Sequence, residues 1–113
     1  MKTHLNSVFV TGASTGIGAA CAHRLAASGT PVFAGVRNAA DGDRLRANYA
    51  SLITPVIIDV TDIASIAAAA QTLTDALGDS GLGGLVNNAG IAIAAPLEVL
   101  PLDQLRRQFE VNV

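Results

Sequence analysis

The stretch that decides the fold is the glycine-rich segment Thr11-Gly12-Ala13-Ser14-Thr15-Gly16-Ile17-Gly18. It directly follows the β-rich run Val8-Phe9-Val10 and opens a segment with helical periodicity. A glycine turn between a strand and a helix leaves free N–H groups at the helix N-terminus, where the helix dipole favours an anion. Gly12 permits a tight exit from the strand, Gly16 lets the backbone approach a pyrophosphate, and Gly18 lets the helix pack closely.

The same alternation of short apolar runs and helix-like segments continues along the rest of the chain. Unbroken apolar strands between helices are typical of a parallel sheet covered on both faces, and right-handed crossovers make such a sheet doubly wound. The sequence therefore predicts a single α/β domain. The expected strands are 8–10, 31–36, 55–58 and one that opens at 85, and the expected helices are 16–28, 41–49, 62–77 and 102–113.

Apolar spacing predicts which face of each helix packs on the sheet. On the first helix, Ile17, Cys21 and Leu25 recur every four residues and form one apolar stripe. The second helix is expected to turn Leu45 inward, and Asp62 is a suitable N-cap for the third. The buried stripe of the third helix is expected to consist of Ile63, Ile66, Ala70 and Leu73.

Composition excludes several classes of function. The chain has 113 residues, of which 50% are hydrophobic and 14% charged, with a formal net charge of −2. This balance offers no basic face for a nucleic-acid partner. Cys21 is the single cysteine, which excludes an internal disulfide. No secretory signal pattern and no apolar run of about 18 residues is present, so we expect a soluble cytoplasmic protein with His4 and His23 at its surface.

Four motifs in order resemble those of the short-chain dehydrogenase/reductase family. Thr11 to Gly18 has the spacing Thr-Gly-x-x-x-Gly-x-Gly, which departs from the general Gly-x-Gly-x-x-Gly fingerprint and is similar to the family's motif. Asp59-Val60 resembles the acidic pair after the third strand, and Asn87-Asn88-Ala89-Gly90 resembles the family's Asn-Asn-Ala-Gly motif. Asn112 matches the Asn of the catalytic tetrad.

This resemblance implies a Rossmann-like, NAD(P)-binding domain over residues 1–113. The family's sheet has the strand order 3-2-1-4-5-6-7, so the chain would supply its first four strands, 3-2-1-4, and be incomplete at its C-terminal side. The implied partner is a small-molecule carbonyl or alcohol. The full-length parent would be a homo-oligomer.

The resemblance also assigns roles at the cofactor pocket. The glycine turn would hold the phosphates and ribose, the Asp59 carboxylate would accept a hydrogen bond from the adenine amino group, and residues 88–90 would line the ribose and nicotinamide. The alternatives, judged from the residues alone, are a ligand-free glycine turn, a solvated or helix-starting acid at Asp59, an Asn-Gly type turn at 87–90 and a solvated Arg37. The expected cofactor-binding residues are Gly12, Ser14, Thr15, Gly16, Ile17, Gly18, Arg37, Asp59, Val60, Asn88, Ala89 and Gly90.

The end of the second strand indicates the choice of cofactor. A carboxylate there would bind the ribose 2′-hydroxyl and select NAD, but the position is Val36 and the next residue is Arg37. The planar guanidinium suits a phosphate, so we expect NADP(H) to be favoured over NAD(H), with Arg37 and Ser14 at the 2′-phosphate. Thr15 argues the other way, because many NADP-using relatives carry a basic residue there.

The family's chemistry is hydride transfer between nicotinamide and a carbonyl or alcohol carbon, with Ser, Tyr and Lys beside the Asn. The single tyrosine, Tyr49, is followed four residues later by Ile53 instead of Lys, so only Asn112 of the tetrad is recognised. We therefore expect the cofactor-binding half of an NAD(P)(H)-dependent oxidoreductase, inactive by itself. The alternative is a non-catalytic dinucleotide-binding module or a truncated gene product.

Overall fold

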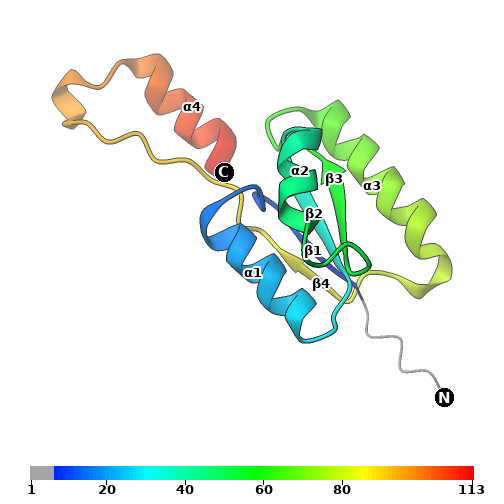
Figure 1. Ribbon diagram of the computed structural model, residues 1–113. Helices are drawn as coiled ribbons and strands as arrows, with labels where there is room; N and C mark the ends of the chain where they lie inside the picture. The colour runs from blue at the N-terminus through cyan, green and yellow to red at the C-terminus, as the bar shows by residue number, and fades with distance from the viewer. Residues whose placement is uncertain (1–6) are drawn as a thin grey trace.

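The computed structural model describes residues 7–113, so the expectation for His4 lies outside the described residues. It contains one parallel sheet with the strand order β3-β2-β1-β4, which confirms the predicted α/β architecture (Figure 1). Two single-turn 3₁₀ helices, η1 (Gly78–Ser80) and η2 (Leu97–Val99), join the regular elements. The strands and α-helices are β1 (Val8–Val10), α1 (Gly16–Ala27), β2 (Val32–Val36), α2 (Ala39–Arg46), β3 (Ile53–Ile57), α3 (Ile63–Leu77), β4 (Gly84–Val86) and α4 (Leu102–Asn112).

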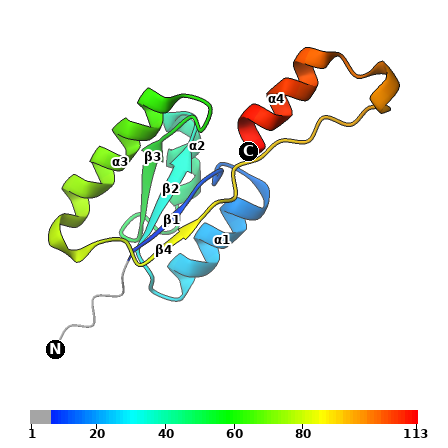
Figure 2. The same cartoon turned by 180° about the vertical axis from the view of Figure 1, so that it is seen from behind.

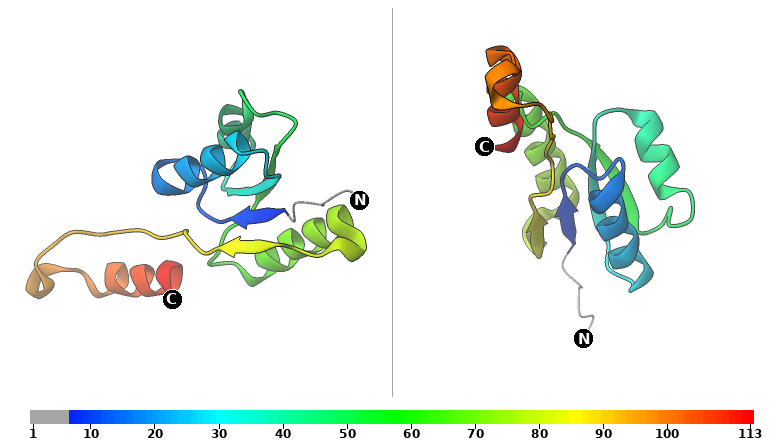
Figure 3. Two further views of the ribbon diagram at one scale, coloured as in Figure 1. Left: turned by 90° about the horizontal axis from the view of Figure 1, so that it is seen from below. Right: turned by 90° about the vertical axis from the view of Figure 1, so that its left-hand side faces the viewer.

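The sheet separates two apolar layers. Figure 3 shows α1 and α2 on one side of the strands and α3 on the other. Successive side chains of a strand point to opposite faces. Accordingly, Val10 belongs to the cluster under α1 and α2, together with Leu45 and Ile53, whereas Phe9 joins Phe33 in the cluster under α3. β2 lies between β1 and β3 and is buried along its whole length.

The face of α1 that packs on the sheet differs from the predicted one. The buried residues are Gly18, Ala22 and Ala26, while Ile17 is 76% exposed and Cys21 only half-buried. Small side chains allow the helix axis to approach the strands closely, so the stripe of small residues faces the sheet. The larger residues Ile17, Cys21 and Leu25 each precede one of these small residues, so they lie beside the face that packs on the sheet.

The prediction for α3 was wrong in the same way. Ile63 is 85% exposed, Ile66 and Ala70 are also exposed, and of the four predicted residues only Leu73 packs against the core. The backbone N–H of Asp59 donates to Ser65 Oγ at 2.8 Å, and the expected Asp62 cap accepts from the N–H of Ala64 at 3.0 Å. These bonds fix the rotation of the helix so that Ser65, Ala69, Leu73 and Leu77 lie along the inner side.

The second helix also begins and ends earlier than expected. Asn38 is its N-cap and accepts from the N–H of Asp41 at 2.9 Å, and the helix stops at Arg46. Tyr49 therefore lies in the turn before β3, which starts at Ile53. Leu45 is buried as predicted, and its carbonyl accepts a hydrogen bond from Nε2 of the exposed His23 at 2.9 Å.

β4 is an edge strand, and the chain leaves the body of the domain after it. Leu85 on this strand is 54% exposed. Residues 87–101 lead to α4, which projects beyond the sheet and has no buried residue among its described positions (Figures 1 and 2). No helix within 7–113 combines the length and apolar character that a membrane span requires.

A matched pair of isoleucine substitutions tests this assignment of faces. Ile53→Ala removes a fully buried side chain and should lower the free energy of unfolding by about 2–5 kcal/mol. Ile63→Ala, on the exposed side of α3, should change it by less than about 0.5 kcal/mol. Urea denaturation followed by circular dichroism measures both, and comparable losses would contradict the packing.

Candidate functional site

Two adjoining cavities open at the carboxyl ends of the four strands, which is where open parallel sheets bind ligands. The first has a volume of about 190 Å³ and the second about 500 Å³. Gly12 and Ala89 line both, because the turn after β1 and the segment after β4 form the wall between them. Predicted residues that line the first cavity are Gly12, Ser14, Thr15, Arg37, Asp59, Val60, Ala89 and Gly90. The second is lined by Gly12, Thr15, Ile17, Asn88, Ala89, Gly90 and Asn112 among the predicted set.

The buried hydroxyl of Thr11 joins the turn after β1 to the segment after β4. Its Oγ1 accepts from the backbone N–H groups of Asn88 and Ala89, each at 3.0 Å, and donates to the carbonyl of Val86 at 3.4 Å. The N–H of Thr11 reaches the same carbonyl at 3.0 Å. The sequence motifs predicted no role for Thr11, and the available signal was its position immediately before Gly12.

Asn88 adds a second connection between the same two segments. Its Nδ2 donates to the carbonyls of Thr11 and Gly12, at 3.2 and 3.1 Å. The side chain was predicted to line the ribose and nicotinamide side, and it does border the second cavity. Its amide nitrogen, however, is engaged by the protein backbone, so Asn88 shapes the wall of the cavity.

The glycine turn is as tight as its spacing predicts. Gly12 has φ +63°, and a Cβ there would stand 2.7 Å from Ala89 Cα. A Cβ on Gly18 would lie 2.1 Å from the Gly12 carbonyl oxygen, so the first turn of α1 packs directly against this segment. Gly16 also has a positive φ, +59°, yet a Cβ there would meet open space beyond its own stretch of backbone. The backbone at Gly16 is therefore open to an approaching group.

The N-terminus of α1 faces this open space. Thr15 is its N-cap in an extended conformation, and within the described part of the chain no side chain caps the first turn. The first N–H groups of a helix lack intrahelical partners and carry part of the positive end of the helix dipole. The geometry is suited to a negatively charged ligand at Thr15 and Gly16.

Arg37 and Asp59 are neighbours in the lining of the first cavity. Arg37 Nη2 lies 3.7 Å from Asp59 Oδ2, and the two side chains are 66% and 37% exposed. Asp59 Oδ1 accepts from the hydroxyl and the backbone N–H of Thr61, at 2.7 and 3.0 Å. The Thr61 bonds, followed by the charges of Arg37 and Arg107, hold the pKa of Asp59 below its ordinary value against the opposing effect of desolvation. The carboxylate is therefore ionised at neutral pH.

Asn112, the predicted tetrad residue, fastens α4 to the segment after β4. Its side-chain amide accepts from the N–H of Ile91 and donates to the Ile91 carbonyl, both at 2.9 Å. Gln108 makes the same pair of bonds with Ile93, at 3.1 and 3.4 Å. Four helical residues rise about 6 Å and two extended residues about 6.6 Å, so both amides can reach the same extended segment of backbone. Sequence reasoning missed Gln108, although its four-residue spacing from Asn112 was visible.

Tyr49 lies apart from this site. Its ring centroid is 5.7 Å from that of His23, and it packs on the cluster beneath α1 and α2. It lines neither of the two cavities. Across residues 7–113, no group of three or more His, Cys, Asp or Glu side chains gathers into a metal-binding arrangement.

Substitution of Thr11 tests the connection between the two segments. Thr11→Val should lower the free energy of unfolding by about 2 kcal/mol, because it leaves the N–H of Ala89 without its acceptor and the N–H of Asn88 with only the Val86 carbonyl, at 3.1 Å. Thr11→Ser keeps the hydroxyl and should lose less than about 1 kcal/mol. Urea denaturation of both variants gives the comparison, and equal losses would show that the methyl group of Thr11 contributes as much as its hydroxyl.

Comparison with known proteins agrees with this geometry. The chain matches the short chain dehydrogenase family over residues 6–113. It is 38% identical over 104 residues to NADPH-dependent 3-dehydrocapnine reductase of Ornithobacterium rhinotracheale, and 38% identical over 107 residues to retinol dehydrogenase 16 of Homo sapiens. These alignments cover 92% and 94% of this chain but 37% and 34% of the relatives. The chain thus spans little more than a third of their length.

Solved structures show the same likeness. NADPH-bound carbonyl reductase from chicken fatty liver has a TM-score of 0.84 and 36% identity, over 93% of this chain and 44% of that one. A dehydrogenase/reductase from Sinorhizobium meliloti 1021 has a TM-score of 0.84 and 36% identity, over 95% of this chain and 43% of that one. With its glycine turn, its strand order and its family match, the chain belongs to the short-chain dehydrogenase family.

Proposed function

We propose that this chain is the cofactor-binding part of an NAD(P)(H)-dependent oxidoreductase that interconverts a carbonyl and an alcohol. NADP(H) is its preferred cofactor. The observation that carries the proposal is the first cavity, in which the turn into α1, Arg37 and Asp59 meet at the carboxyl ends of the strands. Relatives named as a reductase and a dehydrogenase support the reaction class.

The N-terminus of α1 would hold the pyrophosphate. Gly16 has a positive φ and open space before it, and the first turn of the helix carries no side-chain cap. Backbone N–H groups and the helix dipole then provide the favourable electrostatics for a dianionic group. Ser14 and Thr15 line the same cavity and can add hydroxyl donors. The residues present therefore fit the phosphate portion of a dinucleotide.

The adenosine end would lie against Asp59 and Arg37. Asp59 and the backbone of Val60 border the cavity where an adenine amino group would need an acceptor. Arg37 is the cation among the residues that line this cavity, and its side chain is mostly exposed. It would bind a 2′-phosphate. The Ornithobacterium relative is named as an NADPH-dependent reductase, and the chicken carbonyl reductase structure has NADPH bound, which supports the same preference here.

The second cavity would receive the ribose and nicotinamide. When bound, the nicotinamide supplies or accepts the hydride. In this chain, Asn88 and Asn112 hold the backbone that borders the cavity, and Ile17 and Ile91 contribute apolar surface. The substrate would be a small carbonyl compound or alcohol. A cytoplasmic location and a homo-oligomeric parent remain predictions.

A non-catalytic dinucleotide-binding module is the second candidate. It is favoured by the position of Tyr49, which lines neither cavity and therefore offers no proton donor beside the nicotinamide side. Both candidates share the cofactor pocket. Turnover of a carbonyl substrate by the longer protein separates them.

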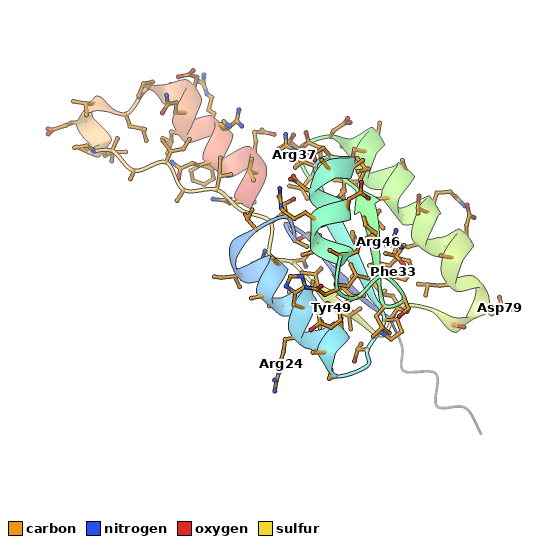
Figure 4. The ribbon with its side chains drawn as sticks, viewed as in Figure 1. Arg24, Phe33, Arg37, Arg46, Tyr49 and Asp79 are labelled. Atoms are coloured by element: carbon orange, nitrogen blue, oxygen red, sulfur yellow. The ribbon has the colours of Figure 1, made fainter. Side chains whose placement is uncertain are left out.

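Titration of the 113-residue chain with NADPH, followed by nicotinamide fluorescence, tests the proposal. NADPH should bind saturably and more tightly than NADH. Arg37→Ala should weaken NADPH binding about tenfold, the loss of one charge-assisted contact, and change NADH binding less than about twofold. Arg24→Ala on the exposed face of α1 is the matched control, well away from Arg37 (Figure 4). Absence of binding in a chain that circular dichroism shows to be folded would contradict the proposal.

A further inference from the structure

We propose that Asp59 determines cofactor specificity as a counter-charge to Arg37, which makes the chain less selective for NADP(H) than Arg37 alone would. This inference rests on the proposed function and concerns the same pocket. It assigns the carboxylate an effect in addition to its expected bond with adenine. Three features support it, namely the distance between the two charges, the immobility of Asp59 and the charges that the neighbouring helix brings to them.

Arg37 and Asp59 are close enough that an anion in the first cavity would interact with both charges. The separation of Nη2 and Oδ2, 3.7 Å, is longer than a hydrogen bond and within the range of an ion pair. A guanidinium has five N–H donors, so Arg37 can bind a phosphate while it stays near the carboxylate. The phosphate would then experience attraction from Arg37 and repulsion from Asp59.

Asp59 has little freedom to turn away from an incoming phosphate. Both bonds from Thr61 end on Oδ1, and the backbone N–H of Asp59 is bound to Ser65 Oγ at 2.8 Å. These contacts leave Oδ2 on the side of Arg37. The negative charge is therefore a fixed feature of the pocket.

The surrounding charges do not cancel this pair. Arg37, Asp59 and Thr61 also line a cleft of about 640 Å³ that faces α4. Helix α4 contributes two cations and two anions to that cleft, namely Arg106, Arg107, Asp103 and Glu110. Of these four, Arg107 adds to the effect of the Thr61 bonds in lowering the pKa of Asp59, so its charge reaches the carboxylate and helps to keep it ionised in the pair.

The two cofactors respond differently to this charge. A 2′-phosphate is a dianion, whereas the 2′-hydroxyl of NAD(H) is neutral. Neutralising Asp59 should therefore strengthen binding of the ligand that carries the 2′-phosphate more than binding of the ligand that lacks it. One unit of charge about 6 Å from a dianion, with an effective dielectric constant of about 80, corresponds to roughly a tenfold change in affinity.

Calorimetric titration of the 113-residue chain with 2′,5′-ADP and with 5′-AMP isolates the effect, because these probes differ only by the 2′-phosphate. The measured quantity is the ratio of the two dissociation constants. Asp59→Asn removes the charge and keeps an oxygen for Thr61, and it should raise the preference for 2′,5′-ADP roughly tenfold. Asp79→Asn, in η1 and far from Arg37, matches the change in net charge and should leave the ratio unaltered (Figure 4).

The Arg37→Ala background shows whether the two residues act together. In that background, Asp59→Asn should raise the preference for 2′,5′-ADP less. Only the repulsion between the carboxylate and the 2′-phosphate is removed, because no guanidinium is freed from its ion pair with Asp59. Asp59→Ser provides a second neutral variant if Asp59→Asn does not fold. A chain that binds both probes with a ratio unchanged or lowered by Asp59→Asn would overturn this inference alone. A folded chain that binds neither probe would overturn the proposed function as well.

Discussion

The hydroxyl of Thr11 is the interaction on which the rest of the site depends. It bridges the exits of β1 and β4 by accepting from two successive N–H groups and donating to the carbonyl of Val86. The two exits lie so close together that only glycine fits at position 12, where a Cβ would stand 2.7 Å from Ala89 Cα. The same crowding requires glycine at position 18. The N-terminus of α1 is consequently directed at the first cavity.

The site combines a rigid backbone wall with two charged side chains. The wall consists of the turn after β1 and the segment after β4, which Asn88 and the Thr11 hydroxyl join. The charges are Arg37 and Asp59, both partly exposed and 3.7 Å apart. In the proposed function, backbone groups and the Asp59 carboxylate meet parts that NAD(H) and NADP(H) have in common, and Arg37 meets the 2′-phosphate in which they differ. Asp59 would thus contribute both to the binding of a dinucleotide and, through its charge, to the discrimination between dinucleotides.

Sequence patterns predicted the glycine turn because it depends on local backbone requirements, whereas the strand order was predicted from the resemblance to a family. They failed for the helix faces. Periodicity marked Ile17 and Ile63 as inward, whereas close packing selected Ala22 and Ala69, because the approach of a helix to a sheet depends on side-chain size and on distant contacts. Thr61 was missed for a similar reason, since its bonds to Asp59 are apparent only once the turn is built.

The most direct measurement is a ¹H–¹⁵N correlation spectrum of the chain during titration with NADP⁺. If the cavity at the carboxyl ends of the strands binds the dinucleotide, amide signals should shift in residues 12–18, 37, 59–61 and 88–90. Signals from the outer face of α3 and from η1 should stay in place. Shifts confined to α3 and η1, or no shifts in a folded chain, would contradict the assignment of this cavity as a dinucleotide site.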